Sequence, residues 1–133
     1  MGPVNWLAVV LGAVAFFAVG SLWYGVLFGK VWQREAGMDD AKVQGGNMGV
    51  TFALCFLLEL IVSSTFGHNL ARIGPPPHVV MMMAFGFGAT LMVPAIGINY
   101  LFQRQSLKLF LIDAGHLVFG TLAMGGVFVL LGY

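Results

Sequence analysis

The sequence has very few charged residues and a single cysteine. Only 8% of its 133 residues are Asp, Glu, Lys or Arg, against about 25% in an ordinary soluble domain. So few charges cannot cover the surface of a water-soluble globule of this size. The lone Cys55 excludes an intramolecular disulfide and a cysteine-based zinc site. A formal net charge of +1 argues against a nucleic-acid partner, so the lipid bilayer is the expected surroundings of the chain.

Short enzyme motifs are also absent from the sequence. The chain contains no glycine-rich phosphate loop joined to a strand, no nucleophile elbow and no HExxH zinc helix. These absences favour a protein that is not an enzyme and that carries no cofactor.

The sequence does contain four long apolar runs, and 59% of its residues are hydrophobic. Each run is long enough for an α-helix to cross a hydrocarbon core of about 30 Å. Transmembrane β-strands would instead show alternating segments of about ten residues. We therefore predict a single all-α domain over residues 1–133, an integral membrane four-helix bundle with helices at about 4–28, 48–70, 79–102 and 107–131.

Polar or helix-breaking segments separate these runs. The first link, Gly29 to Asn47, is the longest polar segment and can form a short interfacial helix around Val31 to Ala36. The second link contains three consecutive prolines at 75–77, which cannot continue a helix. The third link is a tight turn, after which Ser106 can cap the last helix.

Basic residues are distributed unevenly between the two sides of the predicted bundle. The first and third links together hold five Lys and Arg residues, Lys108 included, whereas the second link holds Arg72 alone. Cytoplasmic loops are enriched in Lys and Arg. We therefore predict that both termini lie on the non-cytoplasmic side. No basic segment precedes Val4, so we expect no cleaved secretory signal.

Tryptophan and tyrosine residues fall near the predicted helix ends. We interpret these rings as anchors in the membrane–water interfaces, where amphipathic rings are favoured. Arg104 of the third link either extends inward to pair with Asp113 or extends to the lipid headgroups. The candidates for the cytoplasmic mouth of the bundle are Asn99, Tyr100, Arg104, Trp23 and Tyr24.

Several segments together carry a family resemblance. They are Asn5-Trp6-Leu7-Ala8-Val9, Leu22-Trp23-Tyr24-Gly25 with Leu27-Phe28-Gly29-Lys30 and Trp32, and Asn99-Tyr100-Leu101-Phe102 with Ser106 and Ile112-Asp113-Ala114-Gly115-His116. In these segments the chain resembles the bacterial integral-membrane family filed as domain of unknown function 1761. The resemblance covers the first helix and the whole second half. It implies a multi-pass four-helix protein of the bacterial cytoplasmic (inner) membrane, and it carries over no catalytic role.

Three ionisable residues lie inside the predicted helices. Glu59 lies near the middle of the second helix, and Asp113 and His116 lie three residues apart on one face of the fourth. Glu59 and His116 are expected at similar depth, with Gly120 leaving space above the site. Ionisable residues in a membrane are costly and face the bundle interior or a cavity. The three residues therefore form our candidate site for protons or transport.

Small and polar residues recur at every fourth position of the second helix. Matching strips of small residues lie on the first helix, with Gly12, and on the third, with Gly86. Such residues let helices approach closely. Because these strips exceed what one bundle must pack, we predict a homo-oligomer. The band on the second helix consists of Thr51, Cys55, Glu59, Ser63 and Gly67.

The candidate site allows three kinds of function. A buried carboxyl near a histidine suits a proton relay, so the first hypothesis is a homo-oligomeric proton-coupled or cation carrier or channel for an ion or small ligand. The alternative is a membrane scaffold or accessory subunit in which Glu59 is a buried hydrogen-bond partner of His116 or of a neighbouring subunit. A second alternative is a redox, quinone-binding or metal-binding module, with Glu59, Asp113 and His116 around a divalent ion.

Overall fold

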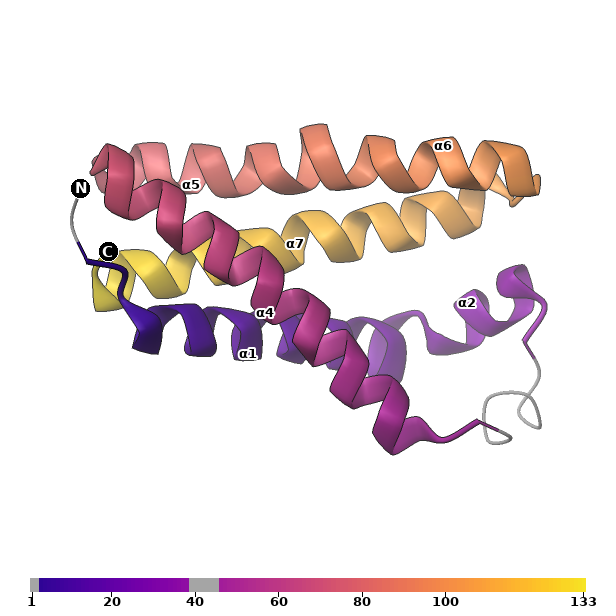
Figure 1. The fold of residues 1–133 in the computed structure, drawn as a ribbon. Coiled ribbons are helices and arrows are strands. Elements are labelled where there is room, and N and C mark those ends of the chain that lie inside the picture. Colours follow the sequence, from indigo (N-terminus) through magenta and orange to yellow (C-terminus); the bar gives the residue numbers. More distant parts are fainter. Residues whose placement is uncertain (1–2, 39–45) are drawn as a thin grey trace.

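Four helical spans, each long and apolar enough to cross a membrane, make up most of the protein (Figure 1). The fold is described from a computed structural model, which covers residues 3–38 and 46–133. The all-α fold class is confirmed. Lys42, which contributes to the predicted charge asymmetry, lies outside the described residues. The spans are Trp6–Leu27, Met48–Ile73, Pro77–Gln103 and Leu107–Leu131.

The first span changes its helix type before it ends. Helix α1 (Trp6–Leu22) continues as a π-helical segment, η1 (Trp23–Leu27), and the chain then turns into the short helix α2 (Gly29–Ala36). The π-helical segment was not predicted from the sequence. A Cβ atom at Gly29 would lie 2.1 Å from the carbonyl oxygen of Tyr24, so the close approach at the junction of η1 and α2 requires glycine.

The other spans begin and end near the helix breaks and the cap predicted from the sequence. Helix α4 (Met48–Ile73) ends at Gly74, which has a left-handed φ of 62°, and Pro77 opens the third span. Ser106 caps the last helix as predicted, because its Oγ accepts a hydrogen bond of 3.0 Å from the backbone N–H of Leu109. The third span consists of α5 (Pro77–Gly86), the π-helical η2 (Phe87–Met92) and α6 (Val93–Gln103), and the fourth span is α7 (Leu107–Leu131).

The buried core occupies the end of the bundle at which both termini lie (Figure 1). The Asn5 side chain joins the two ends of the chain, since its amide donates to the carbonyl oxygens of Leu131 at 3.1 Å and Gly132 at 2.9 Å. We call this end, where α1, α4, α5 and α7 pack together, the closed half. Its largest buried side chains are Phe16, Phe66, Leu70, Met124 and Phe128.

Small residues allow the helices of the closed half to meet within one chain. A Cβ atom at Gly12 would lie 2.8 Å from Ser63 Oγ, and one at Gly120 would lie 2.6 Å from Phe16 Cε1. The expectation that Gly12 contributes to an interface between subunits is therefore wrong, because Gly12 packs inside the protomer. Gly120 does not leave open space above the candidate site either, because the ring of Phe16 fills it.

Helix α4 diverges from α6 and α7 toward its N-terminus (Figure 1). Its C-terminal part contributes Phe66 and Leu70 to the core, whereas its N-terminal part, from Met48 to Cys55, is exposed along its length. We call the end of the bundle that contains this divergence, together with η1, α2 and α6, the open half.

Candidate functional site

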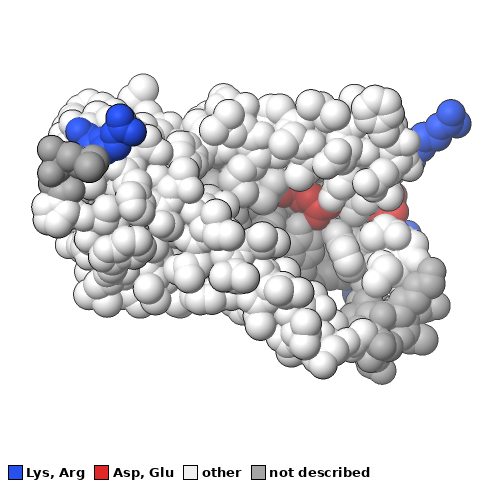
Figure 2. Space-filling model, in the orientation of Figure 1, with Lys and Arg blue, Asp and Glu red and all other residues white. Residues whose placement is uncertain are grey.

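The open half contains a cleft of about 670 Å³. Figure 2 shows acidic atoms within a hollow on the side of the molecule that α4 crosses. The cleft brings together Glu59, Asp113 and His116, the three ionisable residues singled out in the sequence. The side chains and backbone around it come from Phe17, Gly20, Ser21, Tyr24, Gly25, Gly29, Trp32, Gln33, Met48, Phe52, Cys55, Glu59, Ile96, Tyr100, Asp113, His116 and Leu117.

Asp113 is the most enclosed carboxylate of the cleft, with 7% of its surface exposed. The hydroxyl of Tyr24 donates to its Oδ1 at 2.5 Å, and the hydroxyl of Tyr100 donates to its Oδ2. Both oxygens of the carboxylate are therefore engaged. We call these three residues the tyrosine–aspartate cluster. It joins η1, α6 and α7 at the floor of the cleft, since each residue comes from a different element.

The π-helical segment directs two neighbouring aromatic side chains onto α7. Next to Tyr24, the indole N–H of Trp23 donates to the carbonyl oxygen of Ile112 at 2.8 Å. Gly115 makes room for this indole, because a Cβ atom there would lie 2.7 Å from Trp23 Cζ2. Single π turns are frequent at functional sites. The segment 23–27 and the segment 112–116, which both carry the family resemblance, thus fit against each other in space.

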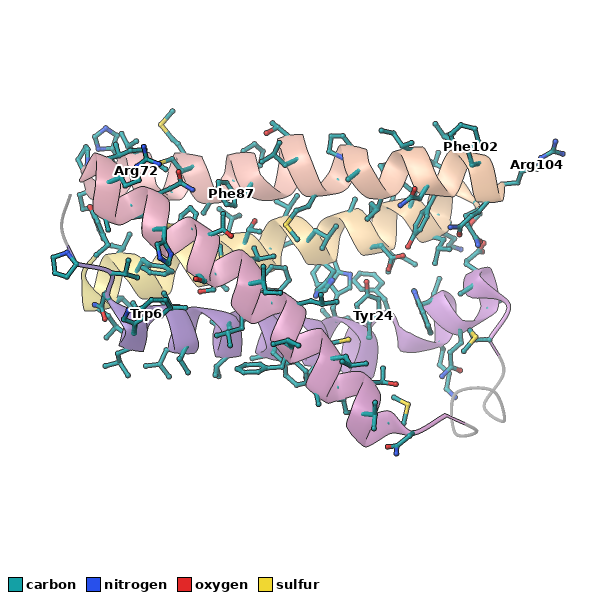
Figure 3. The ribbon with its side chains drawn as sticks, in the orientation of Figure 1. Trp6, Tyr24, Arg72, Phe87, Phe102 and Arg104 are labelled. Atoms are coloured by element: carbon teal, nitrogen blue, oxygen red, sulfur yellow. The ribbon has the colours of Figure 1, made fainter. Side chains whose placement is uncertain are left out.

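The interpretation of these aromatic residues as interface anchors does not describe their contacts. Trp23, Tyr24 and Tyr100 direct their polar atoms to groups on α7, and Trp32 lines the cleft. Figure 3 shows Tyr24 inside the bundle, on the side of η1 that faces α7. The sequence contains no signal that separates an anchoring tyrosine from a buried one at the same depth.

Glu59 and His116 both line the cleft, the first from α4 and the second from α7. Within the described residues, Glu59 Oε2 and His116 Nε2 are buried and have no hydrogen-bond partner. These two atoms are therefore not bonded to each other, and the interpretation of Glu59 as the hydrogen-bond partner of His116 is not supported. The imidazole of His116 instead packs edge-on against the rings of Tyr24 and Phe16, with centroid distances of 5.0 and 5.5 Å.

The candidate residues do not form a metal centre. In the ranges 3–38 and 46–133, no group of three or more His, Cys, Asp and Glu side chains is placed so that it could hold a metal ion. The two tyrosine hydroxyls also occupy the Asp113 oxygens that a metal would need. The described residues therefore give no support to the alternative in which Glu59, Asp113 and His116 surround a divalent ion.

Of the five predicted mouth residues, Trp23, Asn99 and Arg104 are not among the residues that line the cleft. Arg104 ends α6 with a left-handed φ of 57°, and its side chain extends away from the bundle (Figure 3). It does not pair with Asp113, whose oxygens accept from the tyrosines. Asn99 is exposed and is not among the lining residues.

Helix α2 forms one end of the cleft, which sequence reasoning did not anticipate. Trp32 and Gln33 of this helix line the cleft, and the ring of Trp32 lies 5.8 Å from that of Tyr24. Ser106 Oγ donates to Glu35 Oε2 at 2.8 Å, and this bond ties α2 to the start of α7. Helix α2 therefore contributes Trp32 and Gln33 to the site, whereas Glu35 lies outside the cleft lining.

Comparisons with known proteins identify a family. The sequence model of the family described as "Protein of unknown function (DUF1761)" matches residues 7–129. No curated protein and no solved structure matches the chain. The match includes every segment that carries the resemblance seen in the sequence except the first two residues of its opening segment.

Proposed function

We propose that this chain, which belongs to the family described as "Protein of unknown function (DUF1761)", is a small membrane carrier that binds its substrate in the cleft and couples its movement to protons. One observation carries the proposal. Glu59 Oε2 and His116 Nε2 are both buried at the same cleft and have no partner among the described residues. Unsatisfied buried polar atoms are rare and costly, and ionisable residues inside a membrane mark functional sites.

The proposal assigns different roles to the two carboxylates. Asp113 is saturated by the hydroxyls of Tyr24 and Tyr100 and holds the open half together. Glu59 projects from α4, the helix that separates from the bundle, and remains able to exchange a proton or bind a cation. His116 supplies a second group at the same cleft that can exchange a proton, since its Nε2 has no partner among the described residues.

The carrier is proposed to act as a homo-oligomer. A single chain leaves the cleft open on the side where α4 crosses the bundle (Figure 2), so a second copy would complete the enclosure of a substrate. Light scattering in mild detergent tests this point. We expect a dimer or larger assembly, and a stable monomer that still transports would contradict it.

We propose that both termini lie on the non-cytoplasmic side of a bacterial cytoplasmic membrane. The support is the excess of basic residues in the first and third links. In a Cys55→Ala background, Gln105→Cys should react with an impermeant maleimide only from the cytoplasmic side, and His78→Cys only from outside. Labelling in the opposite sense would overturn the orientation.

Transport in liposomes tests the carrier. Wild type and Glu59→Gln are reconstituted, a pH gradient is imposed, and internal pH is followed with and without candidate substrates. We expect proton flux from the wild type and none from Glu59→Gln. Glu35→Gln is the matched control, because Glu35 lies outside the cleft lining and glutamine can still accept from Ser106.

The same samples distinguish the carrier from a scaffold. Melting temperatures of wild type and Glu59→Gln are measured in the same lipid. Absence of wild-type flux above empty liposomes, together with a clear loss of stability in Glu59→Gln, would contradict the carrier and favour the scaffold.

A further inference from the structure

The charges and shape of the cleft indicate the class of ligand that it accepts. We infer that the cleft binds a lipophilic organic cation, whose positive charge lies at Glu59 and whose apolar body lies against aromatic side chains. The assignment of this cation as a transported substrate rests on the proposed carrier function, whereas its binding can be tested separately.

Glu59 is the carboxylate of the cleft that can receive a cationic ligand. The lining contains two carboxylates and, among the residues that the structure describes, no Lys or Arg. Both oxygens of Asp113 already accept hydrogen bonds from tyrosine hydroxyls, whereas Glu59 Oε2 has no partner among the described residues. A phosphate or carboxylate ligand would meet no Lys or Arg among the described lining residues, but a cation would supply the missing partner of Glu59.

The cleft suits an organic cation with apolar substituents better than an inorganic ion. An inorganic ion needs several ligands in a fixed geometry, and the described residues offer no group of three that could provide them. An organic cation needs only one carboxylate, because its substituents replace the hydration shell with contacts to the walls.

Aromatic side chains surround the space beside Glu59. Phe17 and Phe52 meet edge to face at a centroid distance of 5.9 Å on the α1 and α4 walls. Tyr24, Trp32 and Tyr100 continue the aromatic lining toward α2 and α6. Aromatic faces attract organic cations by cation–π interaction, and the volume of about 670 Å³ is that of a site for a drug-sized molecule.

The cleft is accessible from the side of the bundle. Phe52 and Cys55 line the cleft from the exposed N-terminal part of α4, Glu59 lines it further along the same helix, and Ile96 and Tyr100 line it from α6. Figure 2 shows the hollow on this lateral face. Because the helices are of membrane-spanning length and composition, a molecule dissolved in the bilayer would reach Glu59 between α4 and α6.

A pair of ions of one shape and opposite charge tests the inference. Binding of tetraphenylphosphonium and of tetraphenylborate to the purified full chain in detergent is measured by calorimetry. We expect the phosphonium to bind at least tenfold more tightly than the borate. Glu59→Gln should lose at least tenfold in phosphonium affinity, and Glu35→Gln should retain the wild-type value.

Cys55 provides an independent readout in the unaltered protein. It is the only cysteine of the chain, is exposed, and lines the cleft one helical turn from Glu59. Bound phosphonium should slow its alkylation by N-ethylmaleimide at least fivefold, and borate at the same concentration should not. This comparison needs no variant, so it holds even if Glu59→Gln fails to fold.

The outcomes separate the ligand from the carrier. Equal affinity for the two ions, or no protection of Cys55, would overturn the inference even if the protein moves protons. Phosphonium binding that depends on Glu59, in a protein without proton flux, would support the inference and contradict the carrier.

Discussion

The two halves of this molecule are held together by different interactions. In the closed half, Phe16, Phe66 and Phe128 are at most 1% exposed, and glycines bring the helices into direct contact. In the open half, one carboxylate, Asp113, joins three elements through two tyrosine hydroxyls. Close packing leaves no space, whereas a few directed hydrogen bonds can hold helices around a cleft. This division therefore allows one small bundle to contain both a close-packed core and a cleft.

Helices α4 and α7 each belong to both halves. The C-terminal part of α4 packs through Phe66 and Leu70, while its N-terminal part presents Glu59 to the cleft. In α7 the order is the same, with Asp113 in the first half of the helix and Phe128 near its end. Each helix is thus anchored at the closed end and contributes its ionisable residue at the open end.

The largest expected effect comes from breaking the closed half. Phe128→Ala removes a ring with 0% exposure from the centre of the core, and we expect it to lower the free energy of unfolding by about 3–5 kcal/mol. Unfolding of the purified protein by SDS, followed by circular dichroism, measures this change. Phe102→Ala is the control, because Phe102 is 87% exposed, and it should have little effect. Equal losses for the two variants would contradict the assignment of the core.

A smaller loss is expected from breaking the tyrosine–aspartate cluster. Asp113→Ala leaves two tyrosine hydroxyls without their acceptor, and it should cost about 1–3 kcal/mol of stability. Asp113→Asn should cost less, because its amide oxygen still accepts one hydrogen bond.

A double-mutant cycle shows whether the cluster acts as a unit. Tyr24→Phe and Tyr100→Phe each remove one donor to Asp113. We expect the double variant to differ from the sum of the single variants by about 0.5 kcal/mol or more, because both donors share one carboxylate. Strict additivity in the same SDS titration would argue against a shared role.

The smallest effect on stability is expected at Glu59. Its Oε2 has no hydrogen-bond partner among the described residues, so Glu59→Gln removes no bond that this atom makes and should change the free energy of unfolding by no more than about 0.5 kcal/mol. Thermal melting of the wild type and of this variant in one detergent provides the comparison. A loss as large as that of Asp113→Ala would show that Glu59 supports the open half.

Sequence reasoning located the candidate residues but misread several of their neighbours. Helical spacing placed Asp113 and His116 on one face, and depth placed Glu59 near them, because both follow from the regular rise of a helix. The inward direction of Trp23, Tyr24 and Tyr100 was missed, since an aromatic residue near a helix end suits the interface and the interior equally well. The π-helical segment that turns two of these rings onto α7 was also missed, because no residue in 23–27 signals it.

The sequence by itself determined that the chain forms four apolar helices, because membrane-spanning length and hydrophobicity are properties of each segment alone. It also determined the breaks between them, through Gly74, the prolines at 75–77 and the cap at Ser106. Only the tertiary structure decided which glycines pack within the protomer, which carboxylate accepts from two tyrosines and which one keeps an oxygen without a partner among the described residues. These outcomes depend on how α4 diverges from α6 and α7, and contacts between helices far apart in the chain set that divergence.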